Sequence, residues 1–545
     1  MSIPYLTSLV IFLPAVGALL TMIVRGNRAV RWAALGTTTI TFVLSIGLYL
    51  GFDSSVSTAA MPQMADVSDA WFPDSIDIKY MVGIDGLSLL LVMLTTLLGP
   101  IVVLSSWKYI DRQRKGYYAL LLVLQTGVTG VFCAFDVFLF YVFFELTLIP
   151  MYFIIGIWGG ERRIYAAVKF VLFTLVGSLL MLVGILYLGF LAGDAVNEGV
   201  FTTDWYKLLS YNTPIGMQSW LFLLFALSFA IKVPIFPLHT WLPDAHVEAP
   251  TGGSVILAGV LLKMGTYGLV RFCLPFFPNA SQEYALAFAV LAVIGIIYGA
   301  LVSRVQPDAK KLVAYSSVSH LGFVVLGIFA FTTEAMQGAV IQMVNHGIST
   351  GALFLLVGML YERRHTRLME DFGGIAKVVP VLTFFMVFSV LASAGLPGLN
   401  GFVGEFLILL GAFDSEVIGQ PVLIALATSG VILAAVYLLW MVYRIFYGAL
   451  RNEANRSMLD MNAREIALMV PLAVLMLVLG FAPNAFLQKT EPATEFLLET
   501  IERKRFAALE AYEAENVASI FEDRPPAASH VPDDMRSPAT RSRHP

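Results

Sequence analysis

Six ionisable residues lie inside long apolar stretches of this 545-residue chain, where charged side chains are rare. They are Glu145, Lys232, Lys263, His320, His346 and Glu405. A charge near the centre of a bilayer costs at least about 2.5–3.5 kcal/mol on insertion scales, so each of these groups needs a partner or a function. Carboxylate, amine and imidazole groups bind and release protons, and together they predict proton transfer at membrane depth.

Each of these residues has an alternative interpretation as a buried group that a local partner satisfies, above all the two histidines. The residues around the histidines form polar stripes, because positions three or four apart share a helical face. The stripes are Ser316, Ser319 and His320 on one helix and Gln342, His346, Ser349 and Thr350 on the next. They predict either hydrogen-bonded water between titratable groups or ordinary hydrogen bonding between helices, and the sequence leaves both open.

Glu145 and Lys232 are expected to meet, because their depth in the membrane and the order of their helices are similar. A carboxylate about 4 Å from an amine contributes on the order of 4 kcal/mol at an effective dielectric of 20. Opening and closing such a pair therefore changes how firmly the amine holds its proton. An isolated structural ion pair is the alternative. It explains Lys263 and Glu405 poorly, since neither has a group of opposite sign nearby on its own helix.

Two apolar spans are interrupted in the same manner, by FAIKVPIFP at 229–237 and by SAGLPGLNG at 393–401. Backbone groups that proline frees in a bilayer need partners, so broken helices persist where they line a cavity or are buried in protein. The breaks fall in the seventh and twelfth spans, so the two five-span groups that contain them run in opposite senses. Inverted repeats with matched broken helices are typical of transporters. Isolated proline kinks are the alternative.

The elements that position these residues are membrane spans. The chain is 58% hydrophobic and 13% charged, with a mean hydropathy of +0.79, which excludes an ordinary soluble protein. Apolar runs of roughly 20 residues predict an all-α polytopic membrane protein with about 14 transmembrane helices. The spans begin near residues 4, 30, 84, 117, 136, 166, 218, 253, 282, 312, 336, 379, 421 and 466.

The spans group into five segments. Spans 1–3 lie in 1–116, the first inverted repeat (spans 4–8) in 117–273, the second (spans 9–13) in 282–449, and span 14 in 466–487; 488–545 is expected to hold an acidic amphipathic helix and a disordered tail. The acidic character of 489–515 favours docking on a partner subunit over binding to anionic lipid. From Pro525 onward the composition predicts disorder.

Basic residues crowd alternate loops, which the positive-inside rule places in the cytoplasm. These loops carry Arg25, Arg28 and Arg31; Lys108, Arg112, Arg114 and Lys115; Arg162 and Arg163; Arg304, Lys310 and Lys311; Arg363, Arg364 and Arg367; and Arg444, Arg451 and Arg456. An even number of spans then puts both termini on the periplasmic side. The segment 239–252 contains neither Lys nor Arg, so its cytoplasmic placement depends on the count of spans alone.

Other kinds of chemistry fit the sequence poorly. Cys133 and Cys273 cannot build a disulfide framework or a four-ligand cluster, and the net charge of −4 argues against nucleic acid. No cofactor or metal is expected in this chain. Asp136 and Glu161, near the ends of spans, are expected to face the membrane interface.

A metal site is the alternative interpretation of a polar cluster in 239–248, which contains His239, Asp244, His246 and Glu248. Prolines at 237, 243 and 250 interrupt any helix that would align these four side chains. A capped polar loop is therefore the better interpretation.

Several of these segments resemble the antiporter-like subunits of respiratory complex I. They are FYVFFELTLIP (140–150), AIKVPIFPLHTWLPDAHVEAP (230–250), LLKMGTYG (261–268), YSSVSHLG (315–322) and GLPGLNGFVGEF (395–406). The resemblance covers about residues 80 to 485. Related chains usually carry lysine on the twelfth, broken helix, and Glu405 instead matches the chain M branch of the family.

The resemblance implies a role for each buried residue. Glu145 and Lys232 would form a gating ion pair, Lys263 would be the central proton carrier, His320 and His346 would relay protons between two half-channels, and Glu405 would stand in the second half-channel near the periplasm. It also implies that quinone reduction elsewhere in a complex of the bacterial inner membrane supplies the energy. Flavin, iron–sulfur clusters and quinone would belong to other subunits, and the partners would be membrane-arm subunits, including neighbouring antiporter-like chains.

Two further hypotheses stay open at this point. One is a cation/proton antiporter of the related multisubunit type, for which Na⁺-dependent transport without NADH would be diagnostic. The other is a membrane scaffold in which the buried charges only specify packing.

Overall fold

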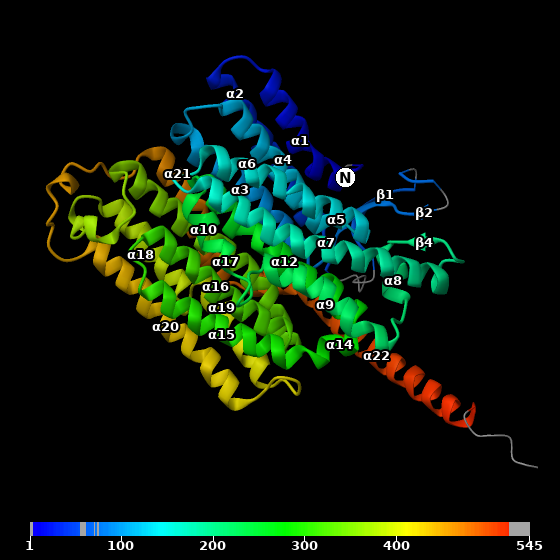
Figure 1. The fold of residues 1–545 in the computed structure, drawn as a ribbon. Helices are drawn as coiled ribbons and strands as arrows, with labels where there is room; N and C mark the ends of the chain where they lie inside the picture. The colour runs from blue at the N-terminus through cyan, green and yellow to red at the C-terminus, as the bar shows by residue number, and fades with distance from the viewer. Residues whose placement is uncertain (1–3, 55–60, 70, 74–75, 523–545) are drawn as a thin grey trace, which may run out of the picture.

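A computed structural model of the chain describes residues 4–54, 61–69, 71–73 and 76–522, with side chains described up to 513. The described part is a bundle of long helices (Figure 1). Within it, 13 helices are long and apolar enough to cross a membrane. The all-α membrane fold expected from composition is therefore confirmed.

The bounds of the long elements follow the predicted spans closely. They are α1 (Leu6–Ile23), α2 (Asn27–Gly51), α3 (Leu89–Tyr109), α4 (Arg114–Cys133), α5 (Val137–Leu146) followed by α6 (Leu148–Trp158), α7 (Arg163–Val196), α9 (Ile215–Lys232), α15 (Ala285–Arg304), α16 (Ala309–Ile328), α17 (Thr333–Arg364), α20 (Pro421–Phe446) and α21 (Ala463–Phe481). One further span, Thr251–Phe276, combines α11 (Thr251–Ile256), η2 (Leu257–Leu261), α12 (Leu262–Gly268), η3 (Leu269–Cys273) and α13 (Leu274–Phe276). Here η2 and η3 are π-helical, a geometry that is frequent at functional sites.

The shorter elements connect the spans or complete the broken ones. They are α8 (Trp205–Ser210), α10 (Trp241–Glu248), α14 (Pro278–Glu283), α18 (Pro380–Ser393), α19 (Asn400–Phe413) and the 3₁₀ turns η4 (Met369–Asp371), η5 (Ile375–Lys377) and η6 (Glu453–Asn455). Both predicted interruptions are present in the described chain. The helix α9 ends at Lys232 and α10 follows at Trp241, whereas α18 ends at Ser393 and α19 begins at Asn400. Gly395 lies in the second break with φ +76°, a conformation that glycine adopts without strain.

Short strands depart from the purely helical expectation in the acidic loops. Strand β1 (Gln63–Ser68) pairs antiparallel with β3 (Tyr80–Ile84), and β2 (Ile76–Asp77) pairs parallel with β4 (Phe201–Thr202). These strands lie beside one end of the bundle (Figure 1). They connect the loop before α3 to the loop after α7.

The basic loops meet one another at the opposite end of the bundle. The Lys115 ammonium donates to the Met22 carbonyl over 2.9 Å, and the Arg363 guanidinium pairs with Glu465 over 2.6 Å. The segment 239–252, which contains α10, belongs to this end, because Arg367 donates to its Val247 carbonyl over 2.6 Å. Basic side chains from neighbouring loops therefore supply the positive charge that this segment lacks.

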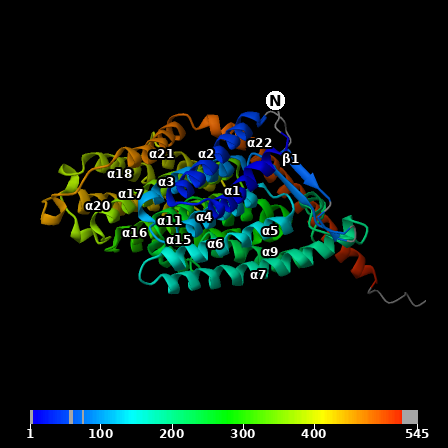
Figure 2. The same ribbon diagram turned by 90° about the horizontal axis from the view of Figure 1, so that it is seen from above.

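The helix α22 (Asn484–Glu522) contains the predicted amphipathic segment. It packs against α9, α13, α14 and α17 and then extends beyond the bundle, while α7 lies on the opposite flank from α21 (Figures 1 and 2). Its residues Ala493, Leu497 and Ile501 are buried against the chain itself. The expectation that this face docks on a partner subunit is therefore wrong for its first half. The predicted disordered tail from Pro525 lies outside the described residues.

Candidate functional site

The centre of the site is a contact between Lys263 and His346, which α12 and α17 bring together. The Lys263 ammonium lies 2.6 Å from His346 Nδ1 and also donates to the Ala258 carbonyl. Both side chains are buried. Because an ammonium is only a donor, His346 Nδ1 accepts the hydrogen bond when Lys263 is charged. This contact can pass a proton between an amine and an imidazole.

A second contact joins His320 on α16 to Glu405 on α19. The Nδ1 atom of His320 lies 2.8 Å from Glu405 Oε1, and the Gln342 amide donates to the same oxygen over 3.2 Å. On the other side of the ring, the Tyr437 hydroxyl lies 3.1 Å from His320 Nε2. With Glu405 ionised, His320 donates from Nδ1 and accepts the Tyr437 proton at Nε2. Four helices therefore fix the orientation of one imidazole.

Two glycines, one in the helix break and one in α19, leave room around Glu405. A Cβ atom at Gly395, in the break, would lie 3.3 Å from Glu405 Oε2. A Cβ atom at Gly404 would overlap the Gln342 side chain. Glycine at both positions therefore makes room for the carboxylate and for the amide that binds it.

The two contacts adjoin each other. The rings of His320 and His346 have centroids 6.0 Å apart. Lys263, His346, His320 and Glu405 thus form a buried row across α12, α17, α16 and α19, with a hydrogen-bonded pair at each end. Among the described residues no hydrogen bond joins the two imidazoles, so the row has a gap at its centre.

Lys232 and Glu145 stand apart from this row. They interact electrostatically, but among the described residues no ion pair within 4.0 Å joins them. The Lys232 ammonium instead lies 4.8 Å from the Phe144 ring centroid and 5.6 Å from that of Phe170. Lys232 Nζ and Glu145 Oε1 are both buried without a hydrogen-bond partner in the described part of the chain. The structure therefore holds this pair in an open arrangement.

Most serines of the predicted polar stripes bond to the backbone. Ser319 donates to the Ile296 carbonyl over 2.8 Å, and Ser349 donates to its own helix at the Asn345 carbonyl over 2.9 Å. These contacts match the alternative of ordinary hydrogen bonding in and between helices. Gln342 is different, because its amide binds the Glu405 carboxylate.

Comparison with known proteins places this arrangement in a family. The family model described as "NADH:quinone oxidoreductase/Mrp antiporter, TM" matches residues 134–434, and the one described as "NADH-ubiquinone oxidoreductase chain 4, amino terminus" matches 54–129. NADH-quinone oxidoreductase subunit M of Rhodobacter capsulatus is 44% identical over 515 residues, which cover 91% of this chain and 96% of the relative. The chain belongs to the subunit M family of NADH-quinone oxidoreductase.

Other members and solved structures agree with this family. Subunit M of Escherichia coli K12 is 45% identical over 86% of this chain and 92% of its own length. A chain of respiratory complex I from Thermus thermophilus matches with a TM-score of 0.80 and 33% identity, over 91% of this chain and 99% of that one. A chain of the Mrp complex from Dietzia shares the fold at 20% identity, with a TM-score of 0.74 and coverage of 91% and 99%.

The site extends to His246 and Lys310, two residues that were expected to lie in loops. His246 is buried, stacks on the Phe354 ring at 4.7 Å, and interacts electrostatically with Lys263 and Lys310. Lys310 is also buried and donates to the Ala249 carbonyl over 2.5 Å. They continue the row from Lys263 toward the end of the bundle with the basic loops.

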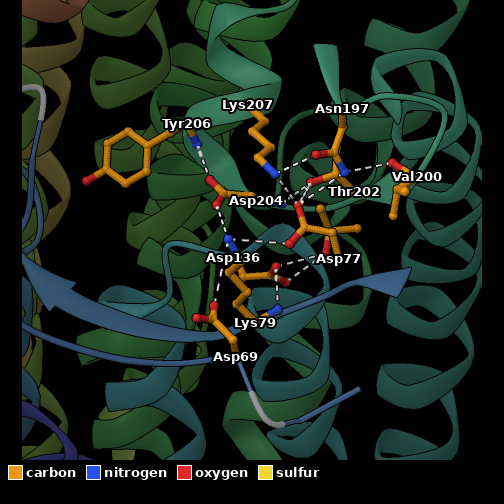
Figure 3. Close-up of polar contacts among 11 residues, drawn as sticks. Asp69, Asp77, Lys79, Asp136, Asn197, Val200, Thr202, Asp204, Tyr206 and Lys207 are labelled. Atoms are coloured by element: carbon orange, nitrogen blue, oxygen red, sulfur yellow. Dashed lines mark hydrogen bonds and ion pairs between the residues drawn. The ribbon is translucent and has the colours of Figure 1, made fainter. Parts of the chain in front are cut away.

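A separate polar cluster lies where the strands meet the bundle (Figure 3). The Lys79 ammonium lies 3.4 Å from Asp77 and 3.3 Å from Asp204, and Lys207 pairs with Asp77 over 2.7 Å. Burial acts to raise the pKa of Asp77, but hydrogen bonds from Lys207 and Thr202 and the Lys79 charge hold it below its usual value. The cluster ties β2 to β4 and α8.

Asp136 belongs to the same region and does not face the membrane interface as expected. It is buried and caps α5, accepting from the backbone amides of Phe138 and Leu139, each over 2.9 Å. The Thr203 hydroxyl donates to it over 2.9 Å. Burial raises the pKa of this carboxyl to about 7 against these hydrogen bonds. Its role in this structure is to cap a helix.

The expectation that 239–248 is a capped polar loop is wrong for most of that segment, because Trp241–Glu248 form the helix α10, with Pro243 in its first turn. The segment forms no metal centre in the described part of the chain. No group of three His, Cys, Asp or Glu residues there could hold a metal ion. Asp244 pairs with Lys169 over 2.7 Å, and Glu248 accepts from the Arg162 amide over 3.0 Å. These side chains fasten α10 to the start of α7.

Proposed function

We propose that this chain translocates protons across the membrane as a membrane-arm subunit of NADH–quinone oxidoreductase. The observation that carries the proposal is the buried row of Lys263, His346, His320 and Glu405, with contacts of 2.6 and 2.8 Å at its two ends and imidazole centroids 6.0 Å apart at its centre. A row of titratable groups inside an apolar bundle is costly unless it has a function. The family of the chain supplies the rest of the assignment.

Lys263 acts as the central carrier in this proposal. Its ammonium passes a proton to His346 Nδ1 over the 2.6 Å contact, while the Ala258 carbonyl holds the amine in place. His346 then carries the proton on the imidazole and releases it from Nε2, which has no partner within the described chain. The two nitrogens of one ring let the proton enter on one side and leave on the other.

His320 and Glu405 receive the proton at the other end of the row. When His320 takes a proton, its Nε2 donates to Tyr437 instead of accepting from it, and the Glu405 carboxylate balances the new charge over 2.8 Å. Glu405 then takes the proton from Nδ1. Its second oxygen, Oε2, faces the break near Gly395 and is the side from which the proton leaves.

Glu145 and Lys232 form the gate in this proposal. The open arrangement seen here, with Lys232 against the Phe144 ring, is one of two states. Closure to an ion pair would hold a proton on Lys232, and opening would release it toward Lys263. Quinone reduction elsewhere in the complex supplies the energy for this cycle.

The topology follows from the same proposal. The 13 long spans and the α18–α19 pair make 14 crossings, with inverted repeats in 117–273 and 282–449. The segments 1–116, 466–487 and 488–545 flank them. The basic loops face the cytoplasm of a bacterial cell, and both termini face the periplasm of the inner membrane.

This chain contributes no redox centre in the proposal. Flavin, iron–sulfur clusters and quinone are bound by other subunits. The partners of the chain are the other membrane-arm subunits, including neighbouring antiporter-like chains, together with the lipid bilayer. Proton movement is therefore its contribution to the enzyme.

A cation/proton antiporter is the second candidate function. One observation favours it: the matching family model includes Mrp antiporters, and a chain of the Mrp complex shares the fold. Na⁺-dependent transport in the absence of NADH would support this candidate over the first.

The deciding experiment extracts native membranes in mild detergent, identifies what migrates with this chain by mass spectrometry, and assays NADH–quinone activity in that band. Flavin and iron–sulfur subunits in an active band are expected. Migration alone, or with small membrane subunits and no NADH activity, would favour the antiporter.

Three variants then separate pumping from packing. Lys232→Ala and Lys263→Ala should leave assembly intact and stop proton movement, whereas a scaffold whose charges only specify packing should fail to assemble. Glu145→Gln should lower coupled turnover. Unchanged coupled turnover in this last variant would contradict the gating pair.

A further inference from the structure

An apolar groove opens between α2 and α21 on the outside of the bundle. Both helices pack against α3, and the space between them has a volume of about 250 Å³. Its walls include Phe42, Tyr49, Met93, Leu475, Leu479 and Phe486. The Tyr49 hydroxyl is the one polar side-chain group in this lining. The groove is therefore a site for a hydrocarbon.

The groove runs from the end of the spans toward their middle. One end is formed by Tyr49, near the end of α2, and by Phe486, in the first turn of α22. The other end is formed by Val344 and Ile348, on either side of His346 in α17. Along α3 the lining extends from Leu90 to Leu97, roughly 10 Å at 1.5 Å per residue. The acyl region of one leaflet is about 15 Å deep, so the groove covers most of it.

A cation stands at the outer end of this groove. The Lys489 ammonium lies 5.1 Å from the Tyr49 ring centroid and 5.6 Å from that of Phe52, and it donates to the Phe52 carbonyl over 3.2 Å. An ammonium has three donors, so two remain for an anion. Lys489 follows the end of the α21 span by eight positions and is half-buried. This is the depth at which phospholipid headgroups meet lysine and tyrosine.

We propose that this groove binds one acyl chain of an anionic phospholipid whose phosphate pairs with Lys489. A helix with its side chains is about 10–12 Å across, which the groove is too small to admit. A single hydrocarbon chain fits. It would give van der Waals contacts to the apolar side chains that line the groove, which have no packing partner on the groove side among the described residues. The charge of Lys489 complements the phosphate, and the apolar walls complement the chain below it.

The bound chain lies directly behind the central row of titratable groups. Leu94 lines the groove and packs on α17 at Gly347, next to His346. Val344 and Ile348, two positions before and after His346, also line the groove. An acyl chain in the groove would therefore keep water away from this stretch of α17.

The test is photolabelling of the purified complex in nanodiscs. The probe is phosphatidylglycerol with a diazirine on its acyl chain, diluted into phosphatidylcholine. After irradiation, mass spectrometry locates the label. We expect Met93 and Leu475 to be labelled more strongly than outward-facing positions of the same helices. Label on the outward-facing positions alone would show that a neighbouring subunit covers the groove, and this would overturn the proposal.

Two variants of adjacent residues provide a matched pair. Leu475→Trp fills the groove and should reduce labelling of Met93 severalfold. Val474→Trp adds the same bulk at a position that is 50% exposed and should leave that labelling unchanged. Equal labelling in both variants would overturn the acyl-chain site. A native gel shows that each complex is assembled.

A third variant tests the headgroup. Lys489→Gln should reduce labelling by the phosphatidylglycerol probe severalfold, and a phosphatidylcholine probe with the same diazirine should be affected less. Unchanged labelling by phosphatidylglycerol in this variant would overturn the assignment of the phosphate to Lys489. None of the three variants touches the proton path, so the outcome is independent of the proposed function.

Discussion

Replacing Glu405 with glutamine tests the charge of the His320–Glu405 contact while keeping the shape of the side chain. In the structure, Glu405 Oε1 lies 2.8 Å from His320 Nδ1 and is buried. Hydrogen bonds to charged groups contribute about 1.5–3 kcal/mol and neutral ones about 0.5–1.5 kcal/mol, so the variant loses roughly 1–1.5 kcal/mol of stabilisation of protonated His320. At about 1.4 kcal/mol per factor of ten, this loss alone should slow proton transfer through His320 about tenfold. Because glutamine also cannot accept the proton that Glu405 passes on, tenfold is the smallest loss expected.

The assay uses the purified complex in proteoliposomes. NADH oxidation is followed by absorbance and proton movement by a pH-sensitive dye in the same vesicles. Both rates should fall at least tenfold in Glu405→Gln, because turnover is coupled to proton transfer. The matched control is Glu416→Gln. This variant neutralises an exposed carboxylate just after α19, the helix that carries Glu405, and should leave both rates unchanged.

Two results would refute this reasoning. Normal NADH oxidation and normal proton movement in an assembled Glu405→Gln complex would show that the charge of Glu405 is not used. Failure of the complex to assemble would show that the carboxylate specifies packing, as the scaffold hypothesis requires. A native gel of the same preparation distinguishes the two.

Three further predictions address stability and geometry. The pKa of Asp136 rises from 3.8 to about 7 on folding, so this group contributes stability below about pH 4 that is lost as the pH rises through 7, roughly 4 kcal/mol in all. Asp136→Asn should therefore reduce the change in unfolding temperature between pH 4 and pH 7. An unchanged pH dependence of the unfolding temperature would contradict this prediction. The buried Arg271 guanidinium pairs with Asp85 over 2.5 Å, and Asp85→Ala would leave this charge unpaired. This variant should destabilise the subunit by about 3–5 kcal/mol and reduce assembly of the complex on a native gel. The double variant Asp85→Ala with Arg271→Met should recover assembly. Gly404→Ala should displace the Gln342 amide, which binds Glu405, and should lower proton movement in an assembled complex. Gly36→Ala is the control, because a Cβ atom at Gly36 would lie in open space, and it should leave proton movement unchanged. Equal proton movement in the two variants would contradict the role of Gly404 in placing this amide.

The spans and their interruptions were predictable because the bilayer imposes a simple rule on composition. Apolar runs of the required length, separated by basic or acidic loops, are visible in any window of the sequence. The two breaks were visible for the same reason, since proline cannot continue a helix. The first predicted break at 229–237 falls between α9 and α10, and the second at 393–401 falls between α18 and α19.

The contacts within the site were not predictable in this way. Lys263 meets His346 across 83 positions and His320 meets Glu405 across 85, and nothing in local spacing selects these partners. Tyr437 was missed because a tyrosine in an apolar span has no distinguishing signal. Lys310 was missed because it lies in a basic loop segment, and only tertiary packing shows that its side chain turns inward.

The open arrangement of Lys232 shows how the break contributes to the chemistry. Lys232 is the last residue of α9, where the helix dipole and the free carbonyl groups favour a cation. Its ammonium also faces the Phe144 ring at 4.8 Å, a cation–π contact. These two interactions stabilise the charge more weakly than Glu145 does, so the ion pair can open with the charge still on Lys232 before the proton leaves toward Lys263. If this is correct, Phe144→Leu should remove the alternative partner and favour the closed pair, which lowers coupled turnover. The matched control is Phe140→Leu, one helical turn earlier on α5 and equally buried, which should keep turnover. Equal turnover in both variants would show that the aromatic face does not hold the open state.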